Sequence, residues 1–73
     1  MNSSEEKLTK AEITFMRILI RLGMSYEETA AIISMVDEDM MWKINERLRE
    51  VDFKVTHQQA MNLIAGVIKE MKQ

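Results

Sequence analysis

The stretch MSYEETAAIISMVDEDMMWKINERL, residues 24–48, decides the fold. Its apolar residues recur at the three- and four-residue spacing of amphipathic helices, and this spacing predicts two helices joined by a tight turn. The second helix begins with three acidic residues, Asp37, Glu38 and Asp39. Carboxylates stabilise the N-terminus of a helix, but they also cancel its attraction for phosphate.

Signals for helix starts recur outside this stretch. Proline is absent, and glycine occurs only at Gly23 and Gly66, so few positions can break a helix. Three Ser/Thr-x-x-Glu/Gln pairs have the form of a capping box, and Asp37 is the predicted cap of a further helix. The three pairs are Thr9 with Glu12, Ser25 with Glu28, and Thr56 with Gln59.

The chain is therefore predicted to be all-α, a small orthogonal bundle of four helices over residues 10–22, 26–35, 38–50 and 57–71. Gly23 is expected to end the first helix in the left-handed conformation. Residues 1–8 are predicted to form a flexible tail and residues 9–73 a single helical domain. A chain of 73 residues buries only about 60% of its unfolded surface, which leaves association with another subunit as an open alternative.

Composition narrows the classes of function. Ten basic and twelve acidic side chains give a net charge of −2, whereas chains that bind nucleic acid are usually strongly basic. Cysteine is absent, which excludes disulfides and thiolate metal sites. No apolar run approaches the roughly 18 residues of a membrane span, and we expect a cytoplasmic protein without membrane contact.

The first predicted helix, residues 10–22, carries two apolar faces. One face consists of Phe15, Ile18, Leu19 and Leu22, and the second consists of Ile13, Met16 and Ile20. Only Thr14, Arg17 and Arg21 form a clear polar strip. A central position in the bundle would cover both faces. Alternatively, the second face meets a partner or a second copy, because exposed apolar patches on monomers seldom exceed a few hundred Å².

The third predicted helix, residues 38–50, places the one tryptophan of the chain on its polar side. The inward side is expected to be Met40, Met41, Ile44, Leu48 and Val51, and the outward side Glu38, Trp42, Asn45, Glu46 and Arg49. Trp and Arg are enriched at the hot spots of protein interfaces. The alternative is that Trp42 folds back over residues 51–55.

The remaining apolar residues are assigned to the core. The alternating Val51, Phe53 and Val55 of the connection are expected to pack against the bundle. The last predicted helix is an ordinary core helix, because its apolar residues fall on one broad stripe when the chain turns by about 100° per residue. That stripe consists of Ala60, Leu63, Ile64, Val67, Ile68 and Met71.

Residues 24–40, MSYEETAAIISMVDEDM, resemble the helix-turn-helix of sigma-factor-type and related bacterial regulators. The motif of that family is similar to S-Y-E-E-I-A-x-x-L-G-I-S followed by the recognition helix, and the likeness extends to residue 44. The resemblance implies that Ala30 lies where the two helices cross and that Ile33, Met35, Met40 and Ile44 are core residues. Ser34 stands where the family usually has the turn glycine.

If the resemblance extends to function, the chain is a dimeric DNA-binding transcriptional regulator with helix 38–50 in the major groove. The residues implied for DNA are then Glu38, Asp39, Trp42 and Lys43, with Arg47 or Arg49 on phosphates. Arg17 and Arg21, with Lys10, form the only basic strip, which is more simply a solvated face. Charge disfavours this alternative, since the carboxylates of Asp37, Glu38 and Asp39 occupy the anion-binding end of the helix.

An enzymatic function finds little support. The only histidine, His57, begins the last predicted helix, and Asp52 is the one acid near it in the sequence. Phosphate-binding loops, His-Glu-x-x-His and calcium loops are absent. The sequence predicts no catalytic residue, metal site, cofactor or small-molecule substrate.

The preferred hypothesis is a non-enzymatic regulatory binding module with a helix-turn-helix-like core that engages protein, as a homodimer or with another partner, rather than DNA. The residues predicted to bind the partner are Glu38, Trp42, Asn45 and Arg49, together with Ile13, Met16 and Ile20.

Overall fold

The computed structural model describes residues 8–72, and these residues form helices and no strand. The helices are α1 (Lys10–Arg21), α2 (Tyr26–Met35), α3 (Glu38–Glu50) and α4 (His57–Met71). The all-α prediction is confirmed, and the predicted ranges differ from the observed ones only at Leu22, which is the C-cap of α1. Apart from Leu8, the tail predicted for residues 1–8 lies outside the described residues.

Each helix begins at a side-chain cap, as predicted. Three of the caps are full capping boxes, in which the hydroxyl accepts from the third helical N–H while the acidic or amide side chain accepts from the cap N–H. The cap hydroxyls belong to Thr9, Ser25 and Thr56, at 3.1, 3.1 and 3.0 Å. At the start of α3, the Met40 N–H donates to Asp37 Oδ1 at 2.8 Å. Substitution of such a cap by alanine typically costs about 1 kcal/mol.

The end of α1 depends on a glycine. Gly23 has a φ of 93°, its N–H donates to the Ile20 carbonyl, and the Met24 N–H donates to the Leu19 carbonyl. This pair of hydrogen bonds is the Schellman arrangement, which places its turning residue in the left-handed region. Here Gly23 occupies that position without the penalty that a Cβ would bring.

The end of α3 has the same arrangement without glycine. Asp52 and Phe53 have φ values of 61° and 57°, and their N–H groups donate to the carbonyls of Arg49 and Leu48. Two consecutive left-handed residues turn the chain sharply, so the alternation expected of residues 51–55 does not apply. Val51 and Phe53 are 46% and 38% exposed, and their predicted packing is wrong; Val55 does pack against the core.

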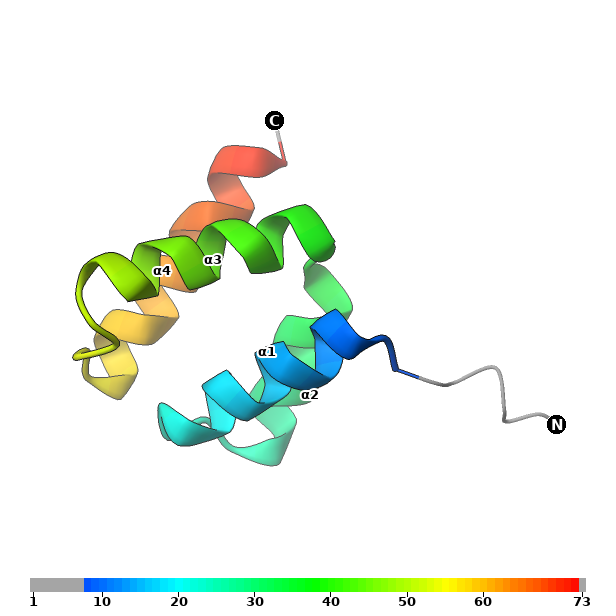
Figure 1. Ribbon diagram of the computed structural model, residues 1–73, viewed down its shortest axis with the longest axis horizontal. Coiled ribbons are helices and arrows are strands. Elements are labelled where there is room, and N and C mark those ends of the chain that lie inside the picture. The colour runs from blue at the N-terminus through cyan, green and yellow to red at the C-terminus, as the bar shows by residue number, and fades with distance from the viewer. Residues whose placement is uncertain (1–7, 73) are drawn as a thin grey trace, which may run out of the picture.

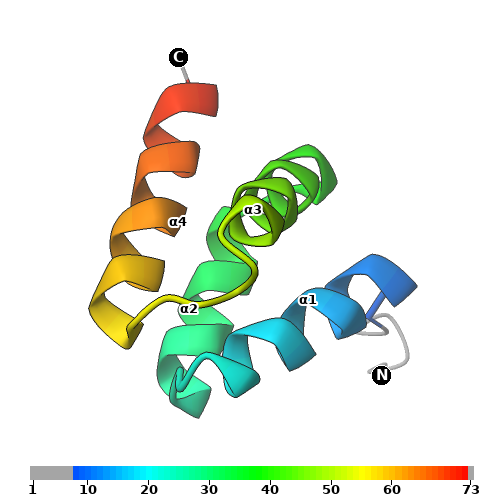
Figure 2. The same ribbon diagram turned by 60° about the vertical axis from the view of Figure 1, so that its left-hand side comes forward.

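The helices are arranged around α3, which contacts α1 on one side and α4 on the other (Figures 1 and 2), while α2 packs against α1. Arg47 and Glu70 join α3 to α4 through an ion pair at 3.1 Å. In Figure 1, α1 and α3 both begin on the right of the view and run in roughly the same direction.

All four helices contribute side chains to the core. Its buried residues are Phe15, Leu19, Met24, Ile32, Met40, Met41, Ile44, Leu48, Ala60, Ile64 and Val67. The predicted inward side of α3 is confirmed except at Val51, which lies beyond the helix, and the predicted stripe of α4 is confirmed except at Met71, which is exposed in the last turn.

The burial of α2 corrects the register that the helix-turn-helix resemblance implied. Ala30 is exposed and Met35 is 47% exposed, whereas Thr29 and Ile32 are buried. Ile33 packs partly against the core. The face of α2 turned toward its neighbours is therefore rotated by one residue relative to the implied one, and Ala30 does not lie at a buried helix crossing.

The two glycines provide a matched test of the fold. A Cβ at either position would meet no atom within 4 Å, so substitution acts through the backbone alone. We expect Gly23→Ala to destabilise the protein by about 1–2 kcal/mol, because its φ is left-handed. Gly66→Ala, within α4, should stabilise it by about 0.5–1 kcal/mol. Urea denaturation measures both, and effects of the same sign would contradict the assigned backbone.

Candidate functional site

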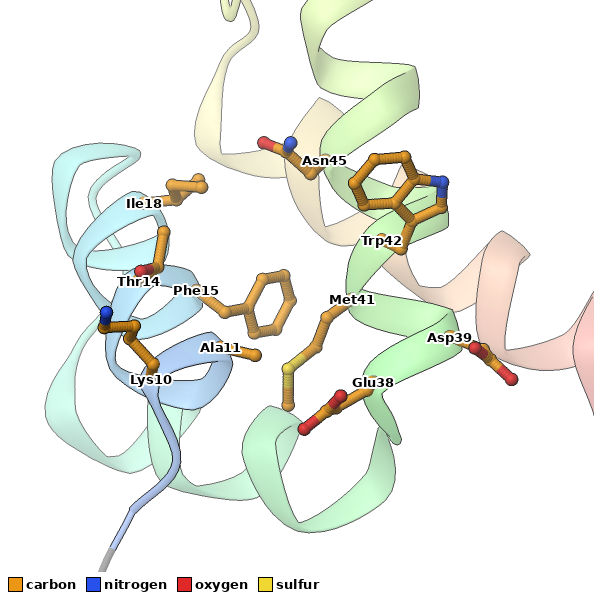
Figure 3. A pocket seen from close by; sticks show the side chains of 10 residues that line it. All are labelled: Lys10, Ala11, Thr14, Phe15, Ile18, Glu38, Asp39, Met41, Trp42 and Asn45. Carbon is orange, nitrogen blue, oxygen red and sulfur yellow. The ribbon is translucent and has the colours of Figure 1, made fainter.

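A groove of about 510 Å³ runs between α1 and α3, and we call it the α1–α3 groove. Its volume lies within the range of about 300–1,000 Å³ that is usual for binding sites. Figure 3 shows it from close by, with side chains of α1 on one wall and of α3 on the other. The lining residues are Lys10, Ala11, Thr14, Phe15 and Ile18 from α1, and Glu38, Asp39, Met41, Trp42 and Asn45 from α3.

The groove has an apolar floor. Phe15 and Met41 are buried at its base and point toward one another across it (Figure 3). Ala11 and Ile18 are partly buried beside them. On each helix the lining residues recur at intervals of three or four positions, the spacing that places side chains on one face of a helix.

Trp42 is the most prominent side chain on the α3 wall. It is 70% exposed, and its indole stands at the edge of the groove above Met41 (Figure 3). The alternative in which Trp42 folds back over residues 51–55 is wrong, because these residues do not line the groove and the indole remains exposed. A large apolar ring is thus held in solvent beside an apolar surface.

The structure brings together only part of the predicted partner-binding set. Glu38, Trp42 and Asn45 line the α1–α3 groove, while Arg49 is exposed further along α3. The α1 residues of the groove were not predicted as site residues: Ala11, Thr14, Phe15 and Ile18. Their role depends on which helix lies opposite, and no local signal in the sequence reveals that.

The second apolar face of α1 lies away from the groove. Ile13 and Ile20 are 40% and 49% exposed, so the alternative in which neighbouring helices cover this face does not hold. Met16 lines a smaller hollow of about 280 Å³ between α1 and α2. The predicted surface that combined this face with Trp42 is therefore divided into two separate surfaces on opposite sides of α1.

The residues predicted for DNA are distributed over several surfaces. Lys43 lies 3.6 Å from Glu46, and Arg47 is held by Glu70. Asp39 and Trp42 line the groove. Arg49 is exposed on α3 and Arg17 and Arg21 are exposed on α1. Two of the cations thus face carboxylates that would have to be displaced or neutralised before phosphate contact.

His57 has a partner that the sequence did not reveal. Its Nε2 lies 3.1 Å from both carboxylate oxygens of Glu28, which also accepts the Ser25 N–H of its capping box at 2.9 Å. The hydrogen bond from the Ser25 backbone and then the contact with His57 lower the pKa of Glu28 from its ordinary value of 4.5. The pair connects the first turns of α2 and α4, and both side chains are partly exposed.

Residues 8–72 contain no group of three or more His, Asp or Glu side chains that could hold a metal ion. None of the helices described is both long and apolar enough to cross a bilayer. Comparison of the chain with known protein families, with curated proteins and with solved structures finds no match.

The Glu28–His57 pair predicts how stability depends on pH. Because the folded pKa of Glu28 lies below 4.5, its contribution is present above that pH and is lost as the pH falls through the lowered pKa. Glu28→Gln keeps a capping acceptor but cannot titrate. We expect the stability advantage of the native chain over this variant to shrink below pH 4.5 in urea denaturation, and a constant difference would contradict the assignment.

Proposed function

We propose that this chain is a non-enzymatic regulatory binding module that holds another polypeptide in the α1–α3 groove. The observation that carries the proposal is the exposed indole of Trp42 beside the apolar floor formed by Phe15 and Met41. Hot spots of protein interfaces are enriched in Trp, which offers a large, rigid apolar area in a central pocket.

The dimensions of the groove favour a helix as its occupant. The α1 wall extends from Lys10 to Ile18, a rise of about 12 Å at 1.5 Å per residue. This length matches two turns of a bound helix. An amphipathic helix of this kind would place apolar anchors at i, i+3 or i+4, and i+7.

The polar groups of the groove support binding rather than catalysis. They comprise an ammonium, two carboxylates, the Thr14 hydroxyl and the Asn45 amide. Among the described residues no hydrogen bond or ion pair joins any two of these side chains. Nucleophilic catalysis uses a nucleophile and a base within hydrogen-bonding reach of one another.

Trp42→Ala tests the proposal. The probes are labelled peptides of about 15 residues, long enough to form a helix, with leucines at i, i+4 and i+7 and varied charged residues. We expect the substitution to weaken binding of the best peptide by at least about tenfold, the loss of 1.4 kcal/mol or more typical of a hot spot. Fluorescence anisotropy measures the affinity, and circular dichroism should show unchanged helicity.

Tyr26→Ala is the matched control. Tyr26 is 84% exposed and lines the hollow between α1 and α2 instead of the groove, so its removal should leave binding unchanged. Equal losses in the two variants would reject the groove as the site. Absence of peptide binding together with binding of a DNA duplex that weakens steeply as salt rises would favour the DNA-binding regulator instead.

A further inference from the structure

The charges at one end of the α1–α3 groove restrict the kind of helix that it can hold. Glu38 and Asp39 line this end from α3 and Lys10 lines it from α1. None of the three takes part in an ion pair among the described residues. Figure 3 shows the Glu38 carboxylate at the mouth of the groove and Asp39 on the outer side of α3. Because Asp39 and the Lys10 ammonium both point away from the space between the two walls, the Glu38 carboxylate gives the mouth of the groove its negative charge.

The same end contains the N-termini of both walls. The two walls run in the same direction, because Lys10 and Ala11 lie at the level of the start of α3 and Ile18 lies at the level of Asn45. The N-terminus of a helix carries a partial positive charge and the C-terminus a partial negative one. A third helix packed antiparallel to both walls would bring its C-terminal end to this end of the groove, where the carboxylates at the start of α3 already offset the positive end of α3.

Basic side chains are the natural complement there. Lysine and arginine are favoured in the last turn of a helix because they interact with its negative end. In an antiparallel helix these residues would reach Glu38 at the mouth of the groove, while their aliphatic stems cover the apolar wall beside Trp42. An acidic partner would meet the like charge of Glu38 at the same place.

We propose that the groove binds a protein partner through an amphipathic helix that runs antiparallel to α1 and α3 and carries lysine or arginine in its last turn. This inference rests on the proposed function, since it specifies the occupant of the same groove. Apolar anchors supply contact with the floor, and the basic turn sets the direction in which the helix lies.

Three peptides that share the same leucine anchors test the inference. One has two lysines in its last turn, the second has the same lysines in its first turn, and the third has two glutamates in its last turn. We expect the first peptide to bind about tenfold more tightly than the third at low salt, since an exposed ion pair with Glu38 contributes up to about fivefold and the glutamates of the third peptide are repelled by the same carboxylate. The first peptide should also bind more tightly than the second, although the two have the same composition.

The double variant Glu38→Gln, Asp39→Asn tests whether these carboxylates recognise the lysines of the peptide. It retains the Asp37 cap of α3 and should lose most of the preference for the first peptide. Glu27→Gln, which removes an exposed carboxylate from the first turn of α2, is the control and should keep it. The peptide comparison on the native chain stands even if the double variant folds poorly.

Each outcome has one meaning. Equal binding of the lysine and glutamate peptides would overturn the basic partner but leave the protein-binding groove intact. Tighter binding of the peptide with lysines in its first turn would overturn the antiparallel direction. Failure of all three peptides to bind would reject the proposed function itself. If the double variant keeps the full preference for the first peptide, the carboxylates of Glu38 and Asp39 do not recognise the lysines.

Discussion

The burial of one side of α3 is the constraint on which the rest of the structure depends. Ile44 and Leu48 have no exposed surface, and α3 contacts α1 and α4 on its two sides. Because α3 lies between α1 and α4 (Figure 2), no other described helix covers the outer edge of the contact between α1 and α3. The α1–α3 groove is the consequence, with Met41 shared between the core and the groove floor.

The acidic start of α3 acts on folding and on binding at once. Asp37 caps the helix, and Glu38 and Asp39 interact favourably with the positive end of its dipole. Because that end opens onto the groove, the Glu38 carboxylate also gives the proposed site its negative charge. The acidic residues that stabilise α3 therefore also repel phosphate and favour basic side chains at this end of the groove.

The local features of this fold could be predicted from the sequence, because each depends on residues a few positions apart. The capping boxes at Thr9, Ser25 and Thr56 and the glycine turn at Gly23 are of this kind. Features that depend on the neighbouring helix could not be predicted. The contact of His57 with Glu28, the pairing of Phe15 with Met41 across the groove and the exposure of Ile13 and Ile20 all follow from tertiary arrangement. Trp42 lies between these cases, since its outward position follows from helical spacing but the groove beside it does not.

The most direct test of the account is nitrogen-15 NMR of the chain titrated with the peptide that carries lysines in its last turn. The account predicts that amide shifts concentrate on the groove walls, at Ala11, Thr14 and Asn45, and at the Trp42 indole N–H. The amides of Ala30 and Gly66, which do not line the groove, should stay unchanged. Shifts concentrated on the face of α1 that contains Ile13 and Ile20, with none in the groove, would contradict the account.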